Sequence, residues 1–297
     1  MKITATTKLL GLFADPAEHS KSPKIFNAIF DKYGMDYAYL AFRVPKGEIG
    51  TAAAAIRVIG MKGANISMPH KEAIIPYLDE ISDEARFCGA VNTVVNDNGM
   101  LKGYNTDIYG AVKAVESLDV KIDGSKVAIL GLGGAGKAVL TGVLGRNPRE
   151  IRVFVRGIDA LKEGKANEAF RAPEAKAFVE KAKEETAASI YLFDLKKTDD
   201  LRDGLSDIDI LINATGVGMG KYEGESLIPD SSFLNNKPAV LDVIYAPEKT
   251  RLLEQAEEAG CRFSNGLSML AYQGEIAFKL MLGREITIND VREAIDA

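Results

Sequence analysis

The sequence is poor in the residues that build disulfide frameworks and many metal sites. Its 297 residues include two cysteines, Cys88 and Cys261, which lie far apart and form no CxxC spacing. They fit neither a disulfide framework nor a zinc knuckle, so we expect a reducing compartment, the cytoplasm. The histidines are His19 and His70, and no H-E-x-x-H motif or dense Asp/Glu/His cluster indicates a metal. We therefore expect no metal cofactor.

Further absences narrow the class of protein. No apolar run reaches about 18 residues, and the opening MKITATTKLLGLFADP has no cleavage-like end, so we expect neither membrane insertion nor export. No G-x-S-x-G elbow indicates a serine hydrolase. The formal net charge is −5, so no global positive field favours nucleic acid as a partner. An anionic small molecule would have to be held by local hydrogen-bond donors.

Short apolar runs alternate with stretches of helical periodicity along the chain. With 46% hydrophobic and 27% charged residues, both halves should contain a core. The alternation predicts an α/β fold with mainly parallel sheets, because parallel strands need crossover connections. In the first part of the chain, strands are expected at 9–13, 38–44 and 63–68, and helices at 23–33, 52–59 and 73–78.

A second α/β unit is predicted to begin near Lys126, where VAILGLGGAGKAV passes from a strand through glycines into a helix. Its later strands are expected at 152–155, 189–193, 208–213 and 240–243. After Arg262, apolar residues again fall at helical spacing, so this helix can return to the first domain. We predict a substrate domain at 1–107, with 267–297 returning to it, and a Rossmann-like dinucleotide-binding domain at 108–266. A cleft between the two domains would hold the ligands.

Four glycines lie between the apolar strand and the following helix, namely Gly131, Gly133, Gly134 and Gly136. Glycine allows a tight turn and lets backbone amides approach a pyrophosphate, which then lies at the positive end of the helix. The spacing departs from G-x-G-x-x-G because an extra glycine intervenes, and a strand-to-helix turn without a ligand is the alternative. The strand before the glycines and the helix after them favour a dinucleotide.

The end of the next predicted strand reads Val155-Arg156-Gly157-Ile158-Asp159. An acid at this place favours a free ribose 2′-hydroxyl, whereas arginine accommodates a 2′-phosphate. Arg156 indicates NADP, but a solvated charge at a strand end is an equal alternative, and Asp159 would oppose the phosphate. We expect measurable use of NAD and at most a modest preference for NADP.

Polar clusters in the first domain lie next to predicted strands and helices. Ser20 and Ser22 precede a helix, where they can donate to a carboxylate or simply cap the helix. Lys71 ends the segment NISMPHK, where a lysine can shuttle a proton, although most lysines are only solvated. Asn92 lies in an otherwise apolar run and needs a partner. Asp107 opens a helix and can cap it or pair with Lys71.

Together these motifs resemble the shikimate dehydrogenase family along nearly the whole chain. The segments that follow the family's order are GLFADPAEHSKSPKIFNAIF, NISMPHK, GAVNTVV, GYNTDIYG, GLGGAGKAV, NATGVGM, DVIYAP and NGLSMLAYQGEIAF. The resemblance implies an NAD(P)-dependent oxidoreductase that oxidises shikimate to 3-dehydroshikimate, quinate to 3-dehydroquinate, or both. It also implies a place in aromatic amino acid biosynthesis.

The resemblance further implies site residues, carried over position by position. Lys71 becomes the acid–base residue and Asp107 its partner. The residues expected to bind substrate are Ser20, Ser22, Tyr39, Ser67, Asn92, Asp107 and Gln273. With the loop residues discussed above, those expected to bind the cofactor are Gly131, Gly133, Gly134, Ala135, Arg156, Asp159, Asn213, Thr215, Tyr245 and Gly266.

Three positions depart from the biosynthetic branch of the family. Ser67 stands where threonine is usual, Gly216 where serine is frequent, and Val-Arg-Gly at 155–157 where an Asn-Arg-Thr cluster is usual. The tripeptide Ser-Met-Pro at 67–69 and Tyr39 look closer to the quinate/shikimate branch, whose members can use NAD. We therefore leave both substrates and both cofactors open.

The expected partner is a small hydroxylated ring carboxylic acid, bound by a monomer or a homodimer. The alternative is a catalytically silent ligand-binding or regulatory protein that kept this scaffold, because fold alone does not imply function. The presence of both Lys71 and Asp107 argues against that alternative.

Overall fold

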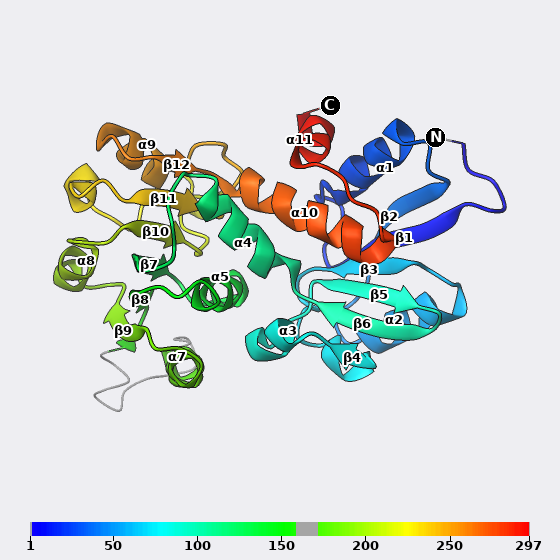
Figure 1. The fold of residues 1–297 in the computed structure, drawn as a ribbon, viewed down its shortest axis with the longest axis horizontal. Helices are drawn as coiled ribbons and strands as arrows, with labels where there is room; N and C mark the ends of the chain where they lie inside the picture. Colours follow the sequence, from blue (N-terminus) through cyan, green and yellow to red (C-terminus); the bar gives the residue numbers. More distant parts are fainter. Residues whose placement is uncertain (1, 159–171, 297) are drawn as a thin grey trace. The chain divides into compact units, whose positions relative to one another are not determined.

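The computed structural model describes residues 2–158 and 172–296, so the predicted cofactor residue Asp159 lies outside the described part. The chain divides into two compact units, unit 1 with Met1–Tyr109 and Ala271–Ala297, and unit 2 with Gly110–Leu270. Each unit contains one six-stranded sheet (Figure 1). Among the described helices, none combines the length and the apolar composition that crossing a membrane requires.

Unit 1 has a mixed sheet with the strand order β2-β1-β3-β5-β6-β4. Its strands are β1 (Lys8–Ala14), β2 (Tyr37–Arg43), β3 (Gly63–Ile66), β4 (Glu80–Ile81), β5 (Thr93–Asp97) and β6 (Met100–Tyr104). Strand β5 runs antiparallel to β3 and β6, whereas the other neighbours are parallel. Asn98 and Gly99 both have positive φ and close the β5–β6 hairpin, the backbone that a two-residue hairpin turn demands.

The helices of unit 1 are α1 (Ser22–Lys32), α2 (Ile49–Val58), α3 (Asp83–Cys88) and α11 (Ile288–Asp296). Helix α1 buries Phe26, whose ring stacks on Tyr39 at 4.5 Å and on Phe278 at 5.9 Å between centroids. The predicted helix at 73–78 is wrong in extent, since only a 3₁₀ turn forms at Ile75–Tyr77. Pro76 removes a backbone donor and disfavours helical φ and ψ at the residue before it.

Unit 2 has an all-parallel sheet with the order β12-β11-β10-β7-β8-β9, as the α/β prediction requires. Its strands are β7 (Lys126–Leu130), β8 (Glu150–Val155), β9 (Ser189–Asp194), β10 (Ile210–Asn213), β11 (Ala239–Asp242) and β12 (Phe263–Ser264). Its helices are α5 (Gly134–Leu144), α7 (Ala172–Glu184), α8 (Thr198–Leu205) and α9 (Arg251–Glu258).

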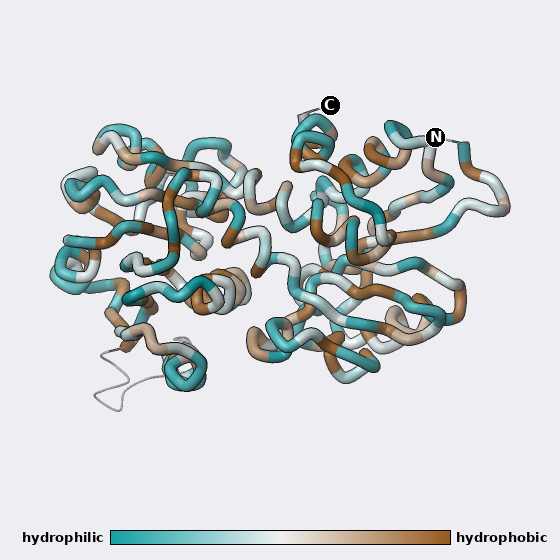
Figure 2. Tube along the Cα trace, in the orientation of Figure 1, coloured by the Kyte–Doolittle hydropathy of each residue, from teal (hydrophilic) through white to brown (hydrophobic). Residues whose placement is uncertain are grey.

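Burial in unit 2 follows the strands. Every residue of β10 and β11 is buried, the pattern of parallel strands covered on both faces. The outer helices α7 and α8 are largely hydrophilic, as Figure 2 shows in teal.

Helices α4 (Thr106–Glu116) and α10 (Gly266–Leu282) each contain a boundary between the units. The turns at the carboxyl ends of the parallel strands are the usual ligand-binding edge of such a sheet.

Candidate functional site

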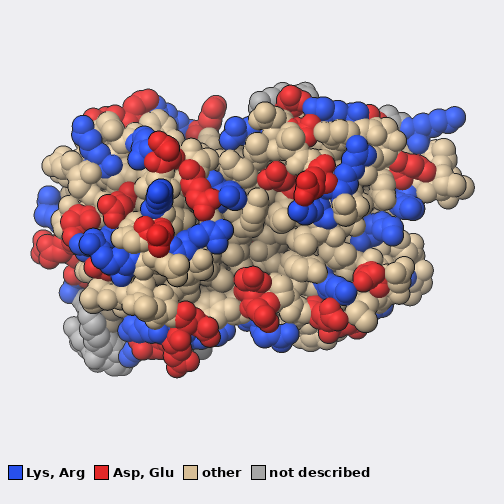
Figure 3. All heavy atoms as spheres, in the orientation of Figure 1, with Lys and Arg blue, Asp and Glu red and all other residues tan. Residues whose placement is uncertain are grey.

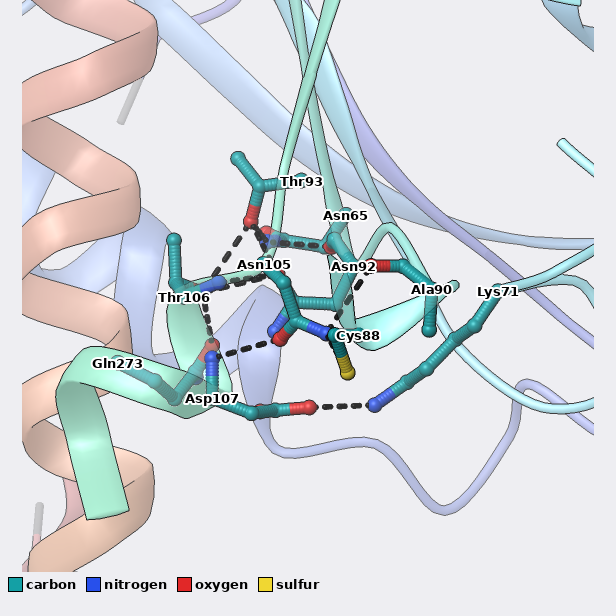
Figure 4. Close-up of polar contacts among 10 residues, drawn as sticks. All are labelled: Asn65, Lys71, Cys88, Ala90, Asn92, Thr93, Asn105, Thr106, Asp107 and Gln273. Carbon is teal, nitrogen blue, oxygen red and sulfur yellow. Dashed lines mark hydrogen bonds and ion pairs between the residues drawn. The ribbon is translucent and has the colours of Figure 1, made fainter. Parts of the chain in front are cut away.

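A short ion pair joins Lys71 and Asp107 in unit 1. Lys71 lies in the loop after β3, and Asp107 lies in the first turn of α4. Lys71 Nζ is 2.6 Å from Asp107 Oδ2, and the two side chains keep 27% and 17% of their surface exposed. Figure 4 shows the side chains pointing toward one another. The pair therefore combines a proton-carrying amine with a carboxylate that orients it, and solvent or a ligand can still reach both.

The backbone around this pair is held by hydrogen bonds. The Lys71 carbonyl accepts from Val91 N at 2.8 Å, and Asp107 N donates to Asn105 Oδ1 at 3.2 Å. His70 is buried, with Nε2 2.7 Å from the Val44 carbonyl, so its ring anchors the loop directly before Lys71. His70 therefore holds the loop in place rather than taking part in a relay with Asp107.

The Asn92 amide lies close to this pair and has a fixed orientation. Its Oδ1 accepts from Thr106 N at 2.7 Å and from Thr93 Oγ1 at 3.0 Å, and Thr106 Oγ1 lies 3.1 Å away. The residue is only 4% exposed, yet no group in the described parts of the chain accepts from its Nδ2. A buried amide donor normally has a partner, so this Nδ2 is free for a ligand oxygen.

Asn92 is connected to a buried chain of hydrogen bonds. Tyr39 donates its hydroxyl to Asn65 Oδ1 at 2.7 Å, and Asn65 Nδ2 donates to Thr93 Oγ1 at 3.1 Å. Tyr39 is fully buried, which raises the pKa of its phenol, and it also bonds to Ser22. Tyr39 was expected to bind substrate, and the structure places its hydroxyl within this buried chain. Asn65 was missed, although a polar residue in the buried strand β3 is a signal for such a network.

The other predicted substrate residues lie at the start of α1, within α10 and directly after β3. Ser20 Oγ accepts from Ser22 N at 3.2 Å, and the N-cap of α1 is Lys21, which makes no side-chain cap bond. Gln273, on α10, accepts from Thr106 Oγ1 at 3.2 Å, which joins it to the Asn92 cluster in Figure 4. Ser67 is half-buried directly after β3.

Unit 2 contains a cavity of about 450 Å³ at the carboxyl ends of its central strands. The wall residues are Gly131, Leu132, Gly133, Val155, Arg156, Ala175, Leu195, Ala214, Thr215, Gly216, Val217, Tyr222 and Leu227. Within this described wall, Arg156 is the one charged side chain, and it is exposed. The strand-to-helix glycine turn therefore borders an open space of the kind that a nucleotide needs.

The four glycines of this turn fall into two kinds. A Cβ added at Gly131, whose φ is +91°, would lie 2.6 Å from Thr215 Cγ2. A Cβ at Gly136 would lie 2.2 Å from the Gly131 carbonyl oxygen. At Gly133 and Gly134 a Cβ would meet nothing within 4 Å. The first two glycines are required by the fold, and the other two leave room for a pyrophosphate at the start of α5, where Ala135 also lies.

The remaining predicted cofactor residues differ in accessibility. Thr215 lines the cavity, whereas Asn213 is 1% exposed and hydrogen-bonded within the protein. Tyr245 is partly exposed in the loop after β11. Gly266 donates to the Ile244 carbonyl at 2.9 Å, and an added Cβ would lie 2.0 Å from the Val243 oxygen. Within 2–158 and 172–296, no group of three His, Cys, Asp or Glu is placed to hold a metal ion.

These two sets of residues define the class of protein. A parallel sheet with a glycine turn beside an open cavity is the architecture that binds dinucleotides, and a lysine–aspartate pair is a candidate for proton transfer. The protein is an NAD(P)-dependent oxidoreductase. Lys and Arg are interspersed with Asp and Glu on the face shown in Figure 3, in keeping with the near balance of the sequence.

Comparison with known proteins identifies the family. Residues 12–94 match the shikimate dehydrogenase substrate binding domain. Shikimate dehydrogenase (NADP(+)) of Listeria monocytogenes is 40% identical over 294 residues, covering 99% of this chain and 97% of that protein. A crystal structure of the Listeria monocytogenes shikimate 5-dehydrogenase with shikimate and NAD has a TM-score of 0.91 at 40% identity, covering 99% and 98%. A shikimate dehydrogenase crystallised with NADP+ has a TM-score of 0.87 at 33% identity, covering 99% and 96%. The chain belongs to the shikimate dehydrogenase family.

Proposed function

We propose that this protein oxidises one ring hydroxyl of shikimate to the ketone of 3-dehydroshikimate, reversibly and with NAD(P). The observation that carries the proposal is the Lys71–Asp107 pair beside buried Asn92, whose Nδ2 has no acceptor among the described residues. An amine, a carboxylate and an amide donor suit a substrate that presents several neighbouring hydroxyls. The relatives that match nearly the full length of the chain are named shikimate dehydrogenases, which supports the same substrate.

Lys71 is proposed to transfer the proton, and Asp107 to hold Lys71 in place. In the oxidation direction, neutral Lys71 Nζ takes the hydroxyl proton, and in reduction its ammonium returns a proton to the oxygen. Asp107 Oδ2 accepts from Nζ and holds the amine in place. The nicotinamide, when bound, supplies the hydride chemistry, and the protein supplies placement. Gly133, Gly134 and Thr215 are the residues proposed to face the dinucleotide.

Separate donors are proposed for the hydroxyls and for the carboxylate of the acid. Asn92 Nδ2 and the Gln273 amide bind ring hydroxyls, since both belong to one cluster with Thr106. Ser20 Oγ accepts from a backbone amide, so its own hydrogen can donate to a carboxylate near the start of α1. The Ser22 hydroxyl is proposed as a second donor to the same carboxylate.

Cofactor choice is proposed to be permissive. Selective binding of a 2′-phosphate usually needs more than one cation or a supported bidentate fork, and the described wall of the cavity offers Arg156 alone. The comparisons point both ways, because a Listeria monocytogenes shikimate dehydrogenase is named for NADP(+), while a crystal structure from the same organism contains NAD. We infer that both dinucleotides support turnover, with at most a modest preference for NADP.

Quinate is proposed as a second substrate. Ser67 lies directly after β3 and is half-buried in the same loop as Lys71. The smaller serine in place of threonine leaves space for the additional ring substituent of quinate, and one methyl group in a pocket discriminates by about 1–3 kcal/mol.

The test is an assay of the purified protein with shikimate and with quinate, each with NAD and with NADP. Formation of the reduced nicotinamide with shikimate supports the main proposal. Binding of shikimate without turnover by either cofactor would instead favour a silent ligand-binding protein. Lys71→Ala is the matched control, because it removes the acid–base group and should leave the fold intact.

A further inference from the structure

A buried carboxylate at the end of β11 takes no part in the proposed chemistry. Asp242 is 0% exposed. Its Oδ1 accepts from Asn213 Nδ2 at 3.1 Å and from Ile244 N at 3.0 Å, and its Oδ2 accepts from Thr250 Oγ1 at 2.7 Å. Burial raises the pKa of this carboxyl, and the three bonds oppose that rise. All three partners are donors, so the geometry fits the carboxylate form.

Asp242 fixes the orientation of Asn213. The two hydrogens of Asn213 Nδ2 go to Asp242 and to the Val217 carbonyl, the latter at 3.3 Å. The amide oxygen therefore faces the other way, where it accepts from Thr215 N at 3.0 Å and from Thr215 Oγ1 at 2.8 Å. In Asp242→Asn one of the two acceptor oxygens becomes an NH2 donor and the other loses its charge, so the preference of the Asn213 amide for this orientation weakens. The carboxylate thus controls Thr215 through one intervening side chain.

These bonds reach the cavity wall. Ala214, Thr215, Gly216 and Val217 line the cavity, and Thr215 Cγ2 packs against Gly131 of the glycine turn. A loop that shifted at Thr215 would change the space next to that turn.

Two further segments depend on the same carboxylate. Ile244 donates its amide to Asp242 and accepts at its carbonyl from Gly266 N at 2.9 Å. Thr250 begins helix α9 and packs against Gly218, where an added Cβ would lie 3.3 Å from Thr250 Cβ. Asp242 therefore links the loop after β10, the loop after β11 and the start of α10, all within unit 2.

We propose that Asp242 is a positioning residue for dinucleotide binding, whose carboxylate holds the loop 213–218, part of the cavity wall, in its conformation and ties the loop 243–250 to it. The inference rests on the proposed function, since it takes NAD(P) as the ligand of that cavity. Asp242 is buried and does not line the cavity. It acts through Asn213, Ile244 and Thr250.

The experiment compares three variants by fluorescence titration with NADPH. Asp242→Asn keeps the shape and removes the charge, and we expect the Kd to rise about tenfold, or 1.4 kcal/mol. Thr250→Val removes one of the three donors, and its Kd should rise by less. The matched control is Arg152→Met, which removes the ion pairs of buried Arg152 on β8 with Glu150 and Asp207, none of which lines the cavity. Its melting temperature should fall while its Kd stays within about twofold of the wild type.

Steady-state kinetics separate positioning from general destabilisation. In Asp242→Asn the KM for NADP should rise with the Kd, while the KM for shikimate at saturating NADP stays within about twofold. A Kd unchanged in both Asp242→Asn and Thr250→Val would overturn the inference, as would an equal rise in Arg152→Met. If Asp242→Asn does not fold, Thr250→Val decides by the same criterion. Failure of the wild type to bind NADPH or NADH would contradict the proposed function itself, a result distinct from the other outcomes.

Discussion

The polar cluster of unit 1 and the cavity of unit 2 are built from opposite kinds of residue. In unit 1, an ammonium, a carboxylate and two carboxamides are placed by hydrogen bonds between side chains. In unit 2, the described wall consists of glycines, apolar side chains and one threonine, with Arg156 as its charged group and Tyr222 at its edge. Removing atoms should therefore damage the first site, whereas adding atoms should damage the second. This difference can be tested in four ways.

The largest effect is expected in unit 1, from Lys71→Ala. Loss of the acid–base group should lower kcat at least ~100-fold and leave the Kd for NADPH unchanged. Lys102→Ala is the matched control. Lys102 lies on β6, its side chain is 28% exposed, and it forms an ion pair with Asp97. Its kcat should stay near the wild-type value. A near-normal kcat in Lys71→Ala would remove this residue from the mechanism.

Adding one carbon at either of two positions in the glycine turn of unit 2 should distinguish a loss of folding stability from a loss of NADPH binding. In Gly136→Ala the new Cβ meets the Gly131 carbonyl, so stability should fall by about 1–3 kcal/mol. Gly133→Ala meets no protein atom, so its melting temperature should be unchanged while NADPH binding weakens. Thermal unfolding and NADPH titration of both variants give the answer. Equal melting temperatures for the two variants would refute this division of the glycines.

Removing the two hydroxyls near α1 should act on substrate binding alone. The double variant Ser20→Ala, Ser22→Ala should raise the KM for shikimate about tenfold or more, because the loss of even one donor to a charged group costs about 1.5–3 kcal/mol. The KM for NADP serves as the internal control and should not move. If the KM for shikimate is also unmoved, the serines only support the helix start and Tyr39.

The smallest effect is expected from Arg156→Ala at the cavity of unit 2. One cation on an exposed strand end should favour NADP by less than about tenfold, or 1.4 kcal/mol. The variant should lose that preference and keep its kcat/KM with NAD. The measurement is kcat/KM for both cofactors at one saturating shikimate concentration. A wild-type preference for NADP of about a thousandfold, roughly 4 kcal/mol, would show that this loop contains a dedicated phosphate site.

The two units also differ in how well their elements are predicted from sequence. The strands expected at 152–155, 189–193, 208–213 and 240–243 end within two residues of those observed. Strands buried on both faces appear as continuous apolar runs, which makes them easy to find. In unit 1 the β5–β6 hairpin and β4 were not predicted, because Asn92 and Thr93 interrupt the apolar pattern there. Those same residues belong to the site.

The residue types, their order and their places at the ends of strands and helices follow from the sequence alone. They were sufficient for the α/β fold, the glycine turn and the choice of Lys71 and Asp107. Only the tertiary structure decides which atom of each amide or hydroxyl already has a hydrogen-bond partner within the protein. Tyr39 and Asn213 were expected to meet ligands, and the structure adds that the Tyr39 hydroxyl and both ends of the Asn213 amide have partners inside the protein, whereas no group in the described residues accepts from Asn92 Nδ2. Hydrogen-bond partners such as Asp242 and Asn213 lie 29 positions apart, and a local pattern contains no information about pairing at that range.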